Sequence, residues 1–118
     1  MQLGGCGASS GVKPSEATCS QFIQLMQTKQ SGAAYSLLSS QMKAIGTPQL
    51  MQTNWNSIEK HYGKIQSWSQ SGFRFYSGTN GSYVNLAYSL KCSHGNTQIG
   101  FNCVEENSKW LIKGMKIR

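Results

Sequence analysis

Side chains that could carry acid–base chemistry are scarce in this sequence. It contains no aspartate, and its four acidic residues are Glu16, Glu59, Glu105 and Glu106. Paired-carboxylate hydrolysis needs two acids across one cleft, and a Ser-His-Asp triad needs an acid behind its histidine. Calcium and magnesium sites need clustered oxygen ligands, mostly carboxylates. Because the only adjacent acids lie in a predicted hairpin turn, where they are solvated, we expect no catalytic residues.

The histidines and cysteines do not form a recognisable site either. His61 follows helical residues next to Tyr62, and His94 lies in a predicted turn. Neither histidine stands at ligand spacing to the cysteines beyond the N-terminus, which are Cys19, Cys92 and Cys103. Zinc sites use short, regular Cys/His spacings that are absent here. We therefore expect no metal and no cofactor, and apolar neighbours should raise the pKa of the thiols rather than activate them.

One disulfide is compatible with an exported protein. If the apolar faces of the two central strands coincide, Cys92 opposes Ile99 and Tyr88 opposes Cys103. The two cysteines then stand roughly 13 Å apart along the ladder, beyond the ~7 Å limit between the Cα atoms of a disulfide. They should not bond. A bond from Cys19 to either of them and three free buried thiols both remain open.

The chain is basic because acids are missing rather than because bases cluster. Its net charge is +7, from 11 lysines and arginines against 4 acids. The lysines are scattered, and the only arginines are Arg74 and Arg118. Nucleic-acid binders usually gather their bases into one patch, so this pattern argues against nucleic acid as a partner. Attraction to an anionic membrane surface fits the charge equally well.

The N-terminal residues resemble a lipidation signal. Leu3-Gly4-Gly5-Cys6 has the aliphatic and small residues that precede the lipidated cysteine of bacterial lipoproteins, and a Gly/Ser-rich stretch follows. We interpret residues 1–14 as a lipobox remnant and flexible tether. This predicts lipidation at Cys6 and anchoring to the membrane on the periplasmic side of a bacterial cell envelope, if a signal sequence precedes Met1. The alternative is an incidental cysteine in a Gly-rich tail.

Residues 15–118 have the pattern of a single α+β domain. A first helix is expected from Ser15, as its N-cap, with a stripe of apolar residues, and a second over residues 33–43. Thr47 and Pro48 mark the start of a third helix, which ends at Gly63. The apolar stripes of the first and third helices contain Cys19, Phe22, Ile23 and Met26, and Met51, Trp55, Ile58 and Tyr62.

After Gly63 the hydrophobic period changes from helical to alternating. We expect a long first strand over residues 64–78, with a bulge near Ser71-Gly72. Three more strands, separated by short polar turns, should follow it. The order predicts three N-terminal helices packed on one face of a bent four-stranded antiparallel sheet.

This layout resembles the nuclear transport factor 2-like (cystatin-related α+β cone) superfamily. The helix pattern L-M-x-x-x-W-x-x-I…Y-G-K-I and the closing W-L-I-K-G-M-K-I are similar to those of a family of small bacterial lipoproteins with this fold. The likeness covers Ser15 to Ile117. It implies a lipidated cysteine, a polar tether and a largely uncharacterised role. Isomerases of this fold use an aspartate base, which this chain lacks.

Two surfaces are candidates for binding. Six side chains could line a pocket inside the cone for a small apolar ligand, or simply fill it: Phe22, Met26, Trp55, Tyr88, Phe101 and Trp110. Three aromatics could form a surface for a protein partner or a homodimer on the outer face of the sheet: Trp68, Phe75 and Tyr83. We expect a non-enzymatic, envelope-anchored binding or assembly module. The alternatives are a small lyase or isomerase using His61, Tyr62 or Tyr88, and a component of a secretion or conjugation apparatus.

Overall fold

The computed structural model describes residues 12–78 and 81–117, so the predicted lipobox and Cys6 lie outside the described residues. Helices come first and strands follow. The helices are α1 (Val12–Gln27), α2 (Ser31–Tyr35), α3 (Ser40–Ala44) and α4 (Pro48–Tyr62). The strands are β1 (Ile65–Gly78), β2 (Gly81–Cys92), β3 (Gly95–Glu106) and β4 (Lys109–Ile117).

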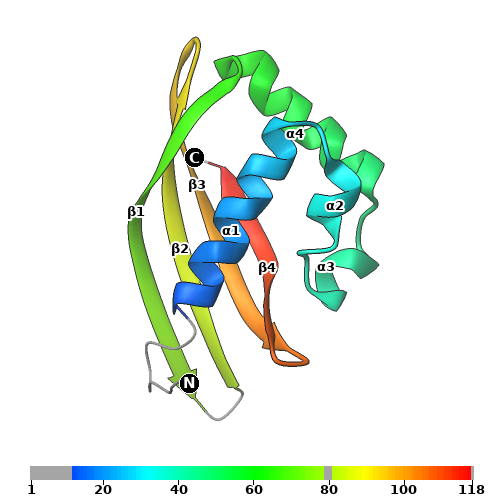
Figure 1. Cartoon of the computed structure of the whole chain (residues 1–118), viewed down its shortest axis with the longest axis vertical. Helices are drawn as coiled ribbons and strands as arrows, with labels where there is room; N and C mark the ends of the chain where they lie inside the picture. The colour runs from blue at the N-terminus through cyan, green and yellow to red at the C-terminus, as the bar shows by residue number, and fades with distance from the viewer. Residues whose placement is uncertain (1–11, 79–80, 118) are drawn as a thin grey trace.

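The four strands form one antiparallel sheet in the order β1-β2-β3-β4. All of the helices lie on the same side of this curved sheet, with α1 running across it and α4 further from the strands (Figure 1). The predicted α+β class and the antiparallel meander are therefore confirmed. The described residues form four helices, however, and not the expected three.

Helix α1 buries its predicted apolar stripe completely. Cys19, Phe22, Ile23 and Met26 are each 0% exposed. The helix begins earlier than expected, however, and Ser15 is a buried residue within it rather than its N-cap. Pro14 is compatible with the earlier start, because proline in the first turn of a helix lacks only an N–H that would have no partner there.

The predicted second helix is broken into α2 and α3 because the chain between them pairs with the edge strand of the sheet. Ile112 in β4 donates its N–H to Leu37 O at 2.9 Å and accepts from Ser39 N at 2.8 Å. These bonds satisfy backbone groups that a continuous helix would have used internally. Ser39 then caps α3 through its side chain, which accepts from Met42 N.

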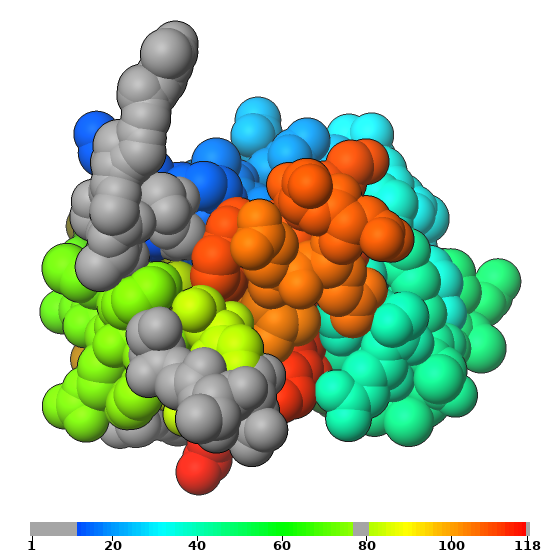
Figure 2. All heavy atoms as spheres, turned by 90° about the horizontal axis from the view of Figure 1, so that it is seen from below, coloured from blue at the N-terminus to red at the C-terminus, as the bar shows by residue number. Residues whose placement is uncertain are grey.

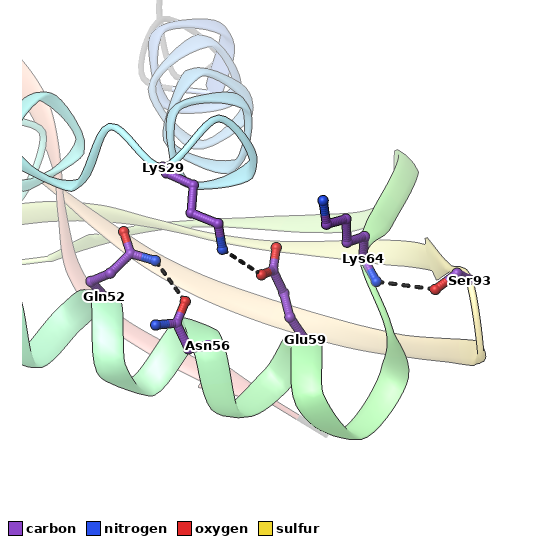
Figure 3. Close-up of polar contacts among 6 residues, drawn as sticks. All are labelled: Lys29, Gln52, Asn56, Glu59, Lys64 and Ser93. Atoms are coloured by element: carbon purple, nitrogen blue, oxygen red, sulfur yellow. Dashed lines mark hydrogen bonds and ion pairs between the residues drawn. The ribbon is translucent and has the colours of Figure 1, made fainter.

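Helix α4 starts and ends as predicted. Thr47 is its N-cap, with the side chain accepting from Leu50 N at 3.1 Å, and Pro48 follows at the first helical position. Gly63 ends the helix at φ 87°, a conformation that favours glycine. Near this end, the ion pair between Lys29 Nζ and Glu59 Oε1, at 2.9 Å, ties α4 to the segment after α1 (Figure 3).

Two bulges in β1 change which side chains face the helices. The register shifts between Ile65 and Ser67 and again between Gln70 and Gly72, where one bulge was predicted. Each extra residue inverts the alternation of faces. The unpredicted bulge before Ser67 places Trp68 opposite buried Leu90, and the predicted one keeps Phe75 on the same face, opposite buried Val84. Both aromatics pack against the core. The prediction that Trp68 and Phe75 lie on the outer face is wrong.

The register of β2 and β3 also differs from the expected one. Cys92 pairs with Gly95 and Cys103 with Val84, because the hairpin turn is only two residues long rather than the five expected. The two cysteines are thus eight positions apart along β2, roughly 27 Å at the rise of a strand. Cys92 and Cys103 are therefore too far apart to bond, as predicted, although the predicted register of β2 and β3 was wrong.

Candidate functional site

The interior between helices and sheet is filled by the aromatic residues predicted to line a pocket. Phe22 packs edge-to-face on Trp55 from α4 and on Phe101 from β3, with ring centroids 6.0 and 5.9 Å apart. Tyr88 packs in the same way on Phe101 at 5.8 Å. These four side chains and Met26 are at most 4% exposed. They form the centre of the core, as close packing of protein interiors favours.

The sixth predicted residue, Trp110, lies at the edge of this core. It is partly buried and packs against the core cluster from β4. Its carbonyl oxygen accepts a hydrogen bond from Thr18 Oγ1 at 2.8 Å, which ties α1 to β4. Trp110 therefore helps to hold α1 against the sheet.

A separate apolar hollow of about 220 Å³ opens among α2, α3, α4 and β4, and we call it the α3–α4 pocket. Its apolar lining includes Leu38, Met42, Met51 and Met115. Two further lining residues are conspicuous because they are large, apolar and exposed: Ile45 at 74% and Leu50 at 50%.

The turn between α3 and α4 positions Ile45 and Leu50 beside the pocket. Ile45 ends the short α3, and Leu50 is in the first turn of α4, so the intervening turn sets their separation. Tyr35 fixes that turn, since its hydroxyl donates to Lys43 O at 2.8 Å and is 3.0 Å from Gly46 O. At the N-terminal end of α3, Ser40 N donates to Glu106 Oε1 and Ser40 Oγ to Glu106 Oε2, both at 3.1 Å.

Figure 2 views the molecule from this end. The segment around α3, in blue-green, lies beside the β3–β4 turn, in orange, as the contacts of Ser40 with Glu106 require. The α3 segment is thereby held at both ends, although the helix has only five residues.

The α3–α4 pocket can hold an apolar group but does not present acid–base chemistry. Among the described residues, its lining contains no acidic residue, histidine or cysteine. The Tyr35 hydroxyl is engaged with backbone oxygens, and the Thr47 hydroxyl accepts from Leu50 N. Sequence reasoning missed this site. The available signal was a pair of apolar residues, Ile45 and Leu50, on either side of a Gly-Thr-Pro turn, where polar residues are usual.

A second hollow, shallow and about 720 Å³, lies on the outer face of the sheet. Its floor includes small residues on neighbouring strands, among them Ala87 and Gly100. Within the part of the chain that the structure describes, its charged lining residues are Arg74 and Lys116. Of the three predicted partner-surface aromatics, Tyr83 lies on this face. It stacks on Tyr76 with centroids 4.6 Å apart and is 38% exposed.

The residues proposed for an isomerase-like site are distributed over the molecule. His61 is exposed at the end of α4, with its ring against Tyr62 at 4.6 Å. Tyr88 is in the core, and its hydroxyl donates to Glu16 O, near the start of α1, at 3.3 Å. Burial raises the pKa of Tyr88, so its hydroxyl is less acidic than usual.

Residues 12–78 and 81–117 contain neither a metal-binding cluster nor a helix that could cross a membrane. No group of three or more histidine, cysteine, aspartate or glutamate side chains there could hold a metal ion. No helix in these ranges has the length and apolar character needed to cross a membrane.

Comparison with known proteins found a likeness in fold and none in sequence family. No protein-family model and no curated protein matches it. Among known structures, it is similar to Aln2 from a Streptomyces species, with a TM-score of 0.60 and 7% sequence identity over 99% of this chain and 94% of that one. At this identity the likeness supports the α+β fold and transfers no activity.

Proposed function

We propose that this protein is a non-enzymatic binding module that holds one apolar group of a protein partner in the α3–α4 pocket. The observation that carries the proposal is the exposure of Ile45 and Leu50, at 74% and 50%, beside the same hollow. Exposed apolar side chains are common singly, but a group of them around a cavity is typical of an interaction site.

The size of the pocket favours a protein partner over a free small molecule. Its volume of about 220 Å³ is below the ~300–1,000 Å³ of pockets that enclose drug-sized ligands. A single leucine, isoleucine or methionine side chain of a partner is a better match, and such buried anchors dominate the energy of many interfaces. Met42, Met51 and Met115 suit this role because methionine adapts its shape to different apolar groups.

The fold family and the location belong to the same proposal. The order of helices before an antiparallel meander supports a nuclear transport factor 2-like domain. Lipidation at Cys6 would tether the domain to the periplasmic side of a bacterial membrane, and the net charge of +7 favours an anionic lipid surface. The module would then present the α3–α4 pocket to proteins of the envelope.

The five methionines provide a direct test with internal controls. In protein labelled with ¹³C at the methionine methyl groups, we expect N-acetyl-leucinamide, a mimic of one apolar side chain, to shift the signals of Met42, Met51 and Met115. The signal of Met26, which is 0% exposed in the core, should not move. Movement of Met26 alone, or of no signal at millimolar probe, would contradict the proposal.

Two matched variants separate pocket binding from general hydrophobic contact. Leu50→Asn removes an exposed apolar side chain at the pocket, whereas Phe73→Asn removes one that is 61% exposed on β1. We expect Leu50→Asn to weaken probe binding several-fold and Phe73→Asn to leave it unchanged. Equal effects of the two variants would show that the probe does not use the pocket.

A further inference from the structure

We propose that Cys19 and Cys103 form a disulfide bond that joins α1 to β3. Their sulfur atoms lie 3.4 Å apart, and both residues are 0% exposed. The two positions are separated by 84 residues, so only the packing of α1 on the sheet brings them together. This inference goes beyond the proposed binding function and does not rest on it.

Two contacts, one to each strand that flanks β3, hold α1 in the position that the bond requires. Next to Cys19 in sequence, Thr18 Oγ1 donates to Trp110 O at 2.8 Å. One turn earlier, Glu16 O accepts from the Tyr88 hydroxyl at 3.3 Å. Bonded sulfurs are ~2.05 Å apart, so the two sulfurs need to approach by little more than an ångström, within the range of side-chain rotation.

The third cysteine of the described residues is not an alternative partner for Cys103. Cys92 is at the other end of β2, paired with Gly95, whereas Cys103 faces Val84. The thiols of Cys19 and Cys103 already share a hydrogen bond. Consistent with that contact, burial and the hydrogen bond raise the pKa of Cys19, and the same hydrogen bond lowers the pKa of Cys103.

The bond forms by thiol–disulfide exchange with a disulfide oxidant, either oxidised glutathione or a thiol–disulfide oxidoreductase. One cysteine thiolate attacks the oxidant's disulfide, forms a mixed disulfide and releases one thiolate. The second cysteine thiolate attacks the mixed disulfide, forms the Cys19–Cys103 bond and releases the second. Each released thiolate takes up one proton, so two cysteine thiols are oxidised and one disulfide is reduced to two thiols.

Burial determines when this exchange can occur and how the product behaves. Because both sulfurs are inaccessible in the folded chain, the exchange takes place while α1 is undocked, during folding or local opening. Once α1 docks, the same burial excludes reductants. The bond closes a long loop, and such cross-links stabilise chiefly by restricting the unfolded chain.

The test is to refold the full chain, carrying Cys6→Ser to remove the tail thiol, in a buffer of reduced and oxidised glutathione. Remaining thiols are then alkylated with N-ethylmaleimide in denaturant. Chymotryptic cleavage after Phe101 separates Cys92 from Cys103 and allows the bond to be assigned by mass. We expect Cys92 to be alkylated, and Cys19 and Cys103 to be linked to each other. Alkylation of all three, or a bond from Cys19 to Cys92, would overturn the proposal.

Thermal unfolding gives a second and independent readout. Oxidised protein with Cys92→Ser should melt about 10 °C or more above its reduced form. With Cys103→Ser, the oxidised and reduced forms should melt at the same temperature. Equal melting of both forms in the Cys92→Ser background would contradict the bond. Should Cys103→Ser fail to fold, the mass assignment in the chain that retains both cysteines still decides between the outcomes.

Discussion

Replacement of Phe22 by alanine tests whether the interior of this domain is filled. Phe22 is 0% exposed and its ring contacts Trp55 and Phe101, so it joins α1, α4 and β3. Truncation of a buried phenylalanine costs about 3–5 kcal/mol of unfolding free energy. Each lost edge-to-face pair contributes ~0.5–1.5 kcal/mol beyond buried area. We therefore expect Phe22→Ala to reach the upper part of the first range, about 4–5 kcal/mol.

Urea denaturation followed by tryptophan fluorescence measures this loss, since the three tryptophans report on both the core and the sheet. Phe73→Ala is the matched control, because Phe73 is 61% exposed and its truncation should cost less than ~1 kcal/mol. The reasoning is refuted if the two variants lose similar stability, since Phe22 would then line an open space that tolerates truncation.

Three further predictions concern stability. Gly63→Ala should destabilise by about 1–3 kcal/mol in the same assay, because φ is 87° and an added Cβ would collide with the turn between β2 and β3; Gly32→Ala, with open space around it, should be neutral or stabilising. Thr47→Ala should cost ~1 kcal/mol through loss of the N-cap, whereas Thr53→Ala on the exposed face of α4 should change thermal stability little. Burial makes the pKa of Tyr88 higher in the folded chain than its unfolded value of ~10. The neutral hydroxyl's contribution to folding stability is therefore fully present below that pH and is lost as the pH rises through the folded pKa, so the stability of Tyr88→Phe should decline less in alkaline denaturation.

The sequence predicted those elements whose structure depends on local chemistry. The stripes of α1 and α4, the Thr47-Pro48 start and the Gly63 stop follow from helical period and backbone preference alone. The buried alternation of β2 follows in the same way, with Val84, Leu86, Tyr88, Leu90 and Cys92 all buried. These features fix the α+β class.

Features that depend on partners distant in sequence were not predictable in the same way. The second helix is broken because Ile112 offers backbone hydrogen bonds to Leu37 and Ser39, which no local pattern shows. Trp68 and Phe75 were assigned to the wrong face because the bulge between Ile65 and Ser67, which was not predicted, inverts the alternation ahead of both residues.

The candidate site illustrates the same limit. Phe22, Trp55 and Phe101 were correctly assigned to the interior, but whether they line or fill it depends on three-dimensional packing. The pocket instead depends on the turn between Ile45 and Leu50 and on Tyr35, which fixes that turn. Exposure of an apolar residue in a short connection is visible only once the connection is placed.

The central claim is that the core is filled and the apolar space lies in the α3–α4 pocket. A crystal of the full chain pressurised with xenon would test it most directly, because xenon occupies empty apolar cavities. We predict one xenon atom among Met42, Met51 and Met115 in the α3–α4 pocket and none between Phe22 and Trp55. Xenon in the interior beside Phe22, with the α3–α4 pocket empty, would contradict both the filled core and the proposed binding site.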